Sequence, residues 1–189
     1  MKNKTEIRFS VLVLLILLAA FSRVVPHMAN FSPLGVIGLF GAAYFSRAWQ
    51  AFLVPIAATW LSDLFINNVI YAQYYPEFTW FYPGFYWQYG SYLLITAFGL
   101  LLFRKNVSVV RVAGGALTSG VLFFLITNFA CWTGSTVYAQ NFGGLMTCYA
   151  AGIPYYKGTL LGDLFYSGVL FGGYYFLQAR FPVLRTEKR

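Results

Sequence analysis

Six apolar stretches separated by short polar segments dominate the pattern along this chain. A helix of about 20 apolar residues crosses the roughly 30 Å hydrocarbon layer of a bilayer. The pattern therefore predicts an all-α fold, a polytopic membrane protein with a six-transmembrane-helix bundle in one integral membrane domain, residues 1–189. The expected helices cover residues 7–25, 31–45, 51–66, 87–103, 112–132 and 159–177.

The Lys and Arg residues are divided unequally between the two sides of this bundle. With the N-terminus in the cytoplasm, eleven of the thirteen fall in cytoplasmic segments, and Arg23 and Lys157 fall outside. Moving Lys and Arg across a bilayer is costly, so short loops rich in them stay inside. We therefore expect both termini in the cytoplasm (N-in, C-in).

Two of the apolar stretches have a second interpretation. Residues 7–25 follow a basic start, as in a signal peptide, but lack a small-x-small cleavage site, so we expect a retained helix. Residues 31–45 span only about 22 Å as a helix and would suit a re-entrant segment. If residues 31–45 did not cross, the basic cluster at 104–111 would lie outside, where Lys and Arg are disfavoured. A short crossing helix is therefore the expected form. Ser32 and Pro33 suit its start.

Composition excludes a soluble fold. Hydrophobic residues make up 59% of the chain and charged residues 10%, against roughly 25% charged in soluble domains. The formal net charge of +8 would suit nucleic acid, but its confinement to one side matches anionic lipid headgroups instead. We expect the lipid bilayer, and no nucleic acid, as a partner.

Strong polar residues gather in the outer half of the predicted bundle. Arg23 and Asn128 lie about 24 Å, and Asp63 about 18 Å, from the cytoplasmic ends of their helices, and Asp163 lies in the first turn of the last helix. Such residues usually face a bundle interior or a cavity, which predicts a polar pocket open to the outside. Structural alternatives remain: Asp63 pairs with Arg23, the helix dipole stabilises Asp163, and Asn128 bridges helices.

The outer loops, residues 67–89 and 133–158, are rich in aromatic residues. An interfacial aromatic belt is the simpler explanation, and a roof over the pocket is the functional one. In the functional interpretation aromatic rings stack on a planar ligand while Asn and Asp bind its polar edge. The candidate substrate-binding residues are Asn30, Asp63, Asn67, Trp80, Tyr82, Trp87, Asn128, Trp132 and Asp163. Residues 142–151 are expected to form a short surface helix.

Two sequence similarities within the chain bear on its organisation. Residues 61–65 (LSDLF) and 161–165 (LGDLF) match in the third and sixth expected helices, which suggests two three-helix halves. Small residues at four-residue spacing predict close helix packing, either within the bundle or against a partner membrane protein. The pairs are Gly38/Ala42, Ala116/Gly120, Gly158/Gly162 and Gly168/Gly172.

Residues that carry chemistry are few. His27 is the single histidine, no phosphate-binding glycine loop is present, and no nucleophile–base pair is recognisable. We expect no catalytic residue, no metal site and no cofactor, and a protein that is not an enzyme. Cys131 and Cys148 both fall outside, where a disulfide is an open alternative.

Residues 30–45, 55–63 and 153–164 resemble a family of uncharacterised bacterial six-helix membrane proteins. In length, helix number, topology and loop distribution the chain also resembles the S components, the substrate-capture subunits of energy-coupling-factor transporters. That resemblance implies the bacterial cytoplasmic (inner) membrane, a vitamin-like ligand, and a membrane coupling subunit with ATPases as a partner. The chain departs from the S components in its first helix, where Arg23 follows Ala19 in place of a second Ala.

These features predict a substrate-binding subunit for uptake of a small micronutrient, with an outward-facing polar pocket roofed by aromatic loops. The alternative is a structural or assembly membrane protein that binds a protein partner through its outer loops.

Overall fold

A computed structural model describes residues 2–185 of the chain, with side chains from residue 4 onward. All regular secondary structure in residues 2–185 is helical, and these residues contain no strand. The helices are α1 (Lys2–Phe21), α2 (Leu34–Tyr44), α3 (Ala48–Phe65), α4 (Phe85–Leu102), α5 (Val109–Thr133), α6 (Phe142–Ser167) and α7 (Gly173–Arg180). Short helical turns extend or connect them: η1 (Ser22–Val24), η2 (Ile66–Ile70), η3 (Ala72–Tyr74), η4 (Gly168–Gly172) and η5 (Pro182–Leu184).

Four helical stretches are long and apolar enough to cross a membrane: residues 4–24, 48–70, 109–133 and 142–180. The last is continuous because the π-helical turn η4 joins α6 to α7. Many large apolar side chains on these helices are exposed, among them Leu14, Leu18 and Leu53. Exposed apolar helix faces of this extent suit lipid rather than water. The all-α fold is thus confirmed, with four helical stretches that could span a membrane.

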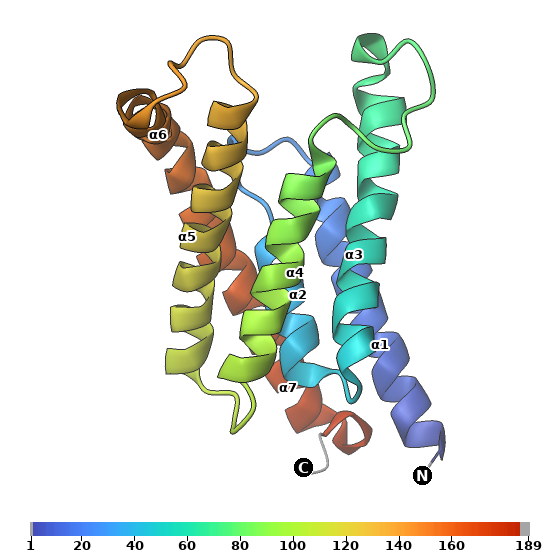
Figure 1. The fold of residues 1–189 in the computed structure, drawn as a ribbon. Coiled ribbons are helices and arrows are strands. Elements are labelled where there is room, and N and C mark those ends of the chain that lie inside the picture. Colours follow the sequence, from blue (N-terminus) through green and yellow to red (C-terminus); the bar gives the residue numbers. More distant parts are fainter. Residues whose placement is uncertain (1, 186–189) are drawn as a thin grey trace.

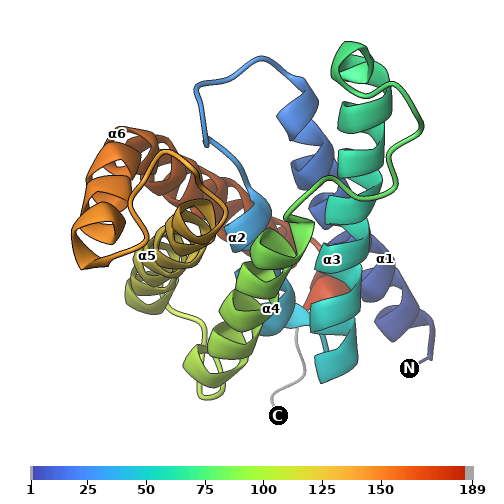
Figure 2. The same cartoon turned by 45° about the horizontal axis from the view of Figure 1, so that its top comes forward.

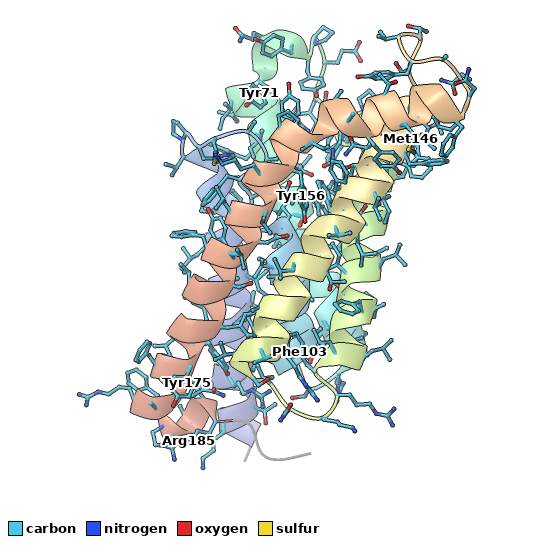
Figure 3. The ribbon with its side chains drawn as sticks, turned by 90° about the vertical axis from the view of Figure 1, so that its left-hand side faces the viewer. Tyr71, Phe103, Met146, Tyr156, Tyr175 and Arg185 are labelled. Atoms are coloured by element: carbon cyan, nitrogen blue, oxygen red, sulfur yellow. The ribbon has the colours of Figure 1, made fainter. Side chains whose placement is uncertain are left out.

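The chain runs back and forth along the long axis of the bundle (Figure 1). Tyr175 and Arg185 lie at the end that also holds both termini, which we call the terminal end, while Tyr71 and Met146 lie at the opposite, distal end (Figure 3). Five of the six predicted helices begin and end within about five residues of their expected bounds.

The second helix is short, as predicted, and lies at the centre of the bundle. It has 11 residues, of which nine are buried, so it rises only about 16 Å. Residues 25–33 complete its path as an irregular segment that descends from the distal end (Figure 2). Ser32 Oγ accepts from the backbone N–H of Leu34 at 3.4 Å, and Pro33 directly precedes the helix.

The predicted bounds of the last helix, 159–177, are wrong. The helix begins at Phe142, where Asn141 caps it by accepting from the Gly144 N–H at 2.9 Å. Its first part lies across the distal end and then turns down the bundle near Tyr156 (Figure 3). Pro154 sits inside the helix at this bend, and an internal proline removes one backbone hydrogen bond and kinks a helix. The surface helix expected at 142–151 is thus the first part of α6.

Glycine allows a close backbone approach where the segment 25–33 crosses α6. A Cβ on Gly158 would overlap the Ala29 carbonyl oxygen, and one on Gly162 would lie 2.7 Å from the Ser32 nitrogen. The Gly158/Gly162 pair therefore packs within the bundle. The Gly168/Gly172 pair does not, because a Cβ at either position would meet nothing within 4 Å.

Candidate functional site

An ion pair joins the end of the first helical stretch to α3 in the distal half of the bundle. Arg23 Nη1 donates to Asp63 Oδ1 at 2.7 Å and to Ser62 Oγ at 2.9 Å. The Tyr89 hydroxyl on α4 donates to the other carboxylate oxygen, Asp63 Oδ2, at 2.8 Å. Both oxygens of Asp63 are therefore bonded, and its pairing with Arg23 is the structural role considered from the sequence.

Tyr82, in the loop before α4, lies close to this ion pair. Its hydroxyl donates to Gln88 Oε1 at 2.8 Å. Burial raises the pKa of the Tyr82 hydroxyl, and the negative charge of Asp63 raises it further. Both effects strengthen the preference of the Tyr82 hydroxyl for its neutral, hydrogen-bond-donating form.

Asp163 occupies a different environment from Asp63, although the sequences around the two residues match. Its side chain is 2% exposed, and among residues 2–185 it has no ion-pair partner. Its oxygens face two glycines: a Cβ on Gly35 would lie 3.2 Å from Oδ1, and one on Gly120 would lie 3.1 Å from Oδ2. Asp163 lies 21 residues into α6, so the expectation that it sits in a first helical turn is wrong, and the helix dipole does not explain it.

A second polar group points to the same place as Asp163. Ser119 on α5 is fully buried, and within the described part of the chain its Oγ has no hydrogen-bond partner. A Cβ on Gly35 would lie 2.5 Å from this Oγ. Gly35 therefore lets a carboxylate and an unpaired hydroxyl approach the same point of the α2 backbone. Buried polar groups without a partner are costly and call for a bound ligand, ion or water.

One face of α6 carries polar side chains at Tyr156, Thr159, Asp163 and Ser167. The spacing of three or four residues places them in line along the helix. Thr159, Asp163 and Ser167 are all buried. Thr159 lines a cavity toward the distal end, and Ser167 lines a second cavity toward the terminal end. The polar face of α6 therefore runs between the two cavities, with Asp163, which lines neither of them, about midway.

The distal cavity has a volume of about 150 Å³. It brings together Asn30 and Asn128, two residues of the predicted site, and is lined by Asn30, Phe123, Phe124, Thr127, Asn128, Gly152, Tyr155, Tyr156 and Thr159. Asn128 donates to the Phe124 carbonyl at 2.8 Å. Asn30 has a φ of 61°, a left-handed conformation that Asn tolerates better than most residues, so it also shapes the turn.

The polar residues of the predicted site were expected to lie at one depth in the bundle, and this expectation is wrong. Asn128 contacts α6 at Gly152, whereas Asp163 contacts α5 at Gly120. The eight residues between positions 120 and 128 of α5 correspond to about 12 Å along the helix. Asp163 is therefore deeper than the sequence suggested. Tyr92, buried on α4, lies within electrostatic range of both Asp63 and Asp163.

The predicted aromatic residues do not gather over one pocket. Trp80 is 59% exposed and stacks on Trp60 at the outer side of α3, with ring centroids 6.3 Å apart. Trp87 and Trp132 both pack on Phe129, between α4 and α5. None of these three tryptophans lines the distal or the terminal cavity. Aromatic rings from the helices, Phe123, Phe124 and Tyr156, border the distal cavity in their place.

Sequence reasoning missed the role of Asn68. Asn67 is buried in η2, but Asn68 is the residue that fixes the loop before α4. Its Oδ1 accepts from the Thr79 N–H at 2.7 Å, and its Nδ2 donates to the Thr79 carbonyl at 3.0 Å. Asn67 and Asn68 are adjacent and identical, so the sequence alone does not show which of them bonds the loop.

No group of three or more His, Cys, Asp or Glu side chains in residues 2–185 is placed to hold a metal ion. Three features of the described fold are chemically distinctive: the carboxylates of Asp63 and Asp163, the distal cavity, and the terminal cavity, which is the one that Ser167 lines.

Comparison with known proteins gives one relationship. No curated protein and no solved structure matches this chain. The model of a family of unknown function, DUF6580, matches residues 3–184, and the chain therefore belongs to that family.

Proposed function

We propose that this protein crosses the bacterial cytoplasmic membrane six times, with both termini in the cytoplasm. The alternating direction of the helices and the four long apolar stretches support this topology. So does the excess of Lys and Arg in segments at the terminal end.

Cysteine labelling tests this topology in a Cys131→Ala, Cys148→Ala background. A membrane-impermeant maleimide added to intact spheroplasts should label Thr136→Cys in the α5–α6 loop. It should label Asn106→Cys in the α4–α5 loop only after permeabilisation. Both positions are exposed. Labelling of both from one side would refute the proposed topology.

Within this membrane we propose that the protein binds a small micronutrient for uptake. The single observation that carries the proposal is the Asp163 carboxylate, buried between two glycines and facing an unpaired Ser119 hydroxyl. Ionisable groups at membrane depth are costly and usually belong to substrate or ion pathways. Asp63 has its own partners, so Asp163 is the carboxylate available to a ligand.

The ligand enters from the distal cavity along the polar face of α6, past Asn30, Asn128 and Thr159. This cavity, at about 150 Å³, is smaller than the roughly 300–1,000 Å³ of typical ligand pockets. Binding of a vitamin-sized molecule therefore requires the cavity to widen. The bend of α6 at Pro154 and the irregular segment 25–33 border it and are the elements that move.

A thermal-shift screen of the purified protein against vitamins, nucleobases and cobamides tests the proposal. We expect one ligand to raise the Tm of the wild type, and Asp163→Asn to weaken that ligand without lowering the Tm of the free protein. Glu77→Gln is the matched control, since Glu77 is an exposed carboxylate of the α3–α4 loop. The proposal fails if no compound stabilises the folded wild type, or if Asp163→Asn binds like the control.

A second candidate function rests on the exposed aromatic loop. Tyr74, Phe78 and Trp80 are each more than half exposed in the α3–α4 connection, which suits a protein partner in an assembly role. Stoichiometric co-purification of an envelope protein that is lost in a Phe78→Ser, Trp80→Ser variant would favour this function. Co-purification of a coupling subunit and ATPases would favour uptake.

A further inference from the structure

A large cavity opens at the terminal end of the bundle, and on α6 its lining begins directly after Asp163, at Leu164 and Ser167. Its volume is about 1170 Å³. Phe103, just after α4, and Tyr175 on α7 both line it, near the terminal end of the bundle (Figure 3). The start of α1, the end of α2, the α4–α5 loop, η4 and the segment 182–185 complete its wall.

The charge of this wall is of one sign. Five cationic side chains line it, and no carboxylate of residues 2–185 does: the cations are Lys4, Arg8, Arg104, Lys105 and Arg185. They come from three separate parts of the chain, so the fold gathers them. Arg8 Nη2 donates to the Tyr44 carbonyl, but Arg8 Nε is buried and has no partner in the described residues. Concentrated positive charge without counter-charge favours an anionic occupant.

The part of the cavity wall formed by the end of α6 and by η4 carries an unpaired hydroxyl and two glycines. Ser167 is 4% exposed and lines the cavity, yet its Oγ has no hydrogen-bond partner in the described residues. Gly168 and Gly172 line the cavity one turn apart on η4, and a Cβ on either would meet no atom within 4 Å. The turn η4 is π-helical. This form is rare overall, and where it occurs it is often at a functional site. The unpaired hydroxyl is independent of the cations and also indicates an occupant.

Apolar side chains form the rest of the wall, including Phe103, Val112, Leu164 and Phe171. An occupant that matches every part of this surface has an anionic head at the basic rim and an apolar portion against these residues. Phosphate groups suit clustered Arg and Lys, because they carry up to two charges and several acceptor oxygens.

We propose that the terminal cavity binds a phosphate-bearing molecule with an apolar portion, held by Arg8, Arg104 and Lys105. The same chemistry belongs to an anionic phospholipid of the surrounding membrane and to a soluble phosphorylated compound. Asp163 itself does not line this cavity, and the variants below leave Asp163 unchanged, so their outcome can be distinguished from that of the uptake proposal.

The variant Arg104→Gln, Lys105→Gln removes two cations from an exposed loop of the cavity rim. The control Arg47→Gln, Arg180→Gln removes two exposed cations that are outside the lining, with the same change in net charge. In the lipid arm, native mass spectrometry counts phosphatidylglycerol against phosphatidylcholine retained from mixed nanodiscs. In the soluble arm, pyrophosphate stabilisation is measured in detergent at constant ionic strength.

We expect the rim variant to weaken at least one probe about tenfold, as two lost charge-assisted contacts would, while the control stays within about twofold. Loss of phosphatidylglycerol retention identifies a lipid source, and loss of pyrophosphate binding a soluble one. The proposal is overturned if neither probe binds the wild type saturably, or if both variants lose binding equally.

Discussion

The Arg23–Asp63–Tyr89 network gives a stability prediction whose size follows from the structure. Asp63→Asn keeps the shape of the side chain and leaves an oxygen to accept from Tyr89, but removes the negative charge opposite Arg23. The Arg23 side chain is 18% exposed and that of Asp63 is 8% exposed. Breaking a fully buried pair costs about 3–5 kcal/mol. Because water reaches Arg23 in part, we expect a loss of about 2–3 kcal/mol.

A loss of this size lowers the Tm by about 4–12 °C for a chain of this length. The double variant Arg23→Gln, Asp63→Asn should be less destabilised than the sum of the single variants, because it leaves no unpaired charge. We expect a coupling energy of about 1–2 kcal/mol. Equilibrium unfolding in mixed micelles measures all four members of the cycle, with Glu77→Gln as the surface control. Strict additivity, with coupling below about 0.5 kcal/mol, would refute the assignment of this pair as a stabilising contact.

Two further predictions concern packing and thiol chemistry. Gly158→Ala should destabilise the fold by about 2–3 kcal/mol, because the added methyl overlaps the Ala29 carbonyl. In the same unfolding assay the control Gly90→Ala should be neutral or slightly stabilising, because its added methyl meets nothing within 4 Å. The Cys131 and Cys148 thiols are free, and Cys148 Sγ donates to the Asn128 carbonyl at 3.5 Å, one turn before Cys131 on α5. A mild oxidant should therefore link the two thiols within one chain, and mass spectrometry that finds both unreacted after oxidation would contradict this prediction.

The helices were predictable because lipid imposes a simple rule on the chain. A span must be apolar and long enough, and stretches such as residues 112–132 satisfy this without reference to any neighbour. The bounds of α6 were not predictable in this way. Residues 142–158 contain Pro154, a lysine and several glycines, which usually mark a loop, and tertiary packing on α5 overrides them.

The candidate site was predictable in its residue types but not in its geometry. Asp63 and Asp163 occur in nearly identical local sequences, and their difference comes from what faces them. Arg23 lies opposite Asp63, whereas Gly35 and Gly120 lie opposite Asp163. Local sequence does not encode which distant residue will be the neighbour.

The terminal cavity was missed because its cations had a sufficient explanation in membrane topology. Positive loops on the cytoplasmic side need no binding role. One signal was present in the Gly168/Gly172 pair, which has the spacing of a packing motif. Only the structure shows that no neighbouring helix packs against this pair.

The central position of α2 has a consequence for how the protein is made. A segment that enters lipid with an unwound first half exposes backbone N–H and C=O groups that only protein neighbours can satisfy. Those neighbours, above all α4 and α3, are translated after it. We therefore expect residues 25–44 to remain at the translocon or at the interface during synthesis, and to settle between the other helices as the last step of assembly.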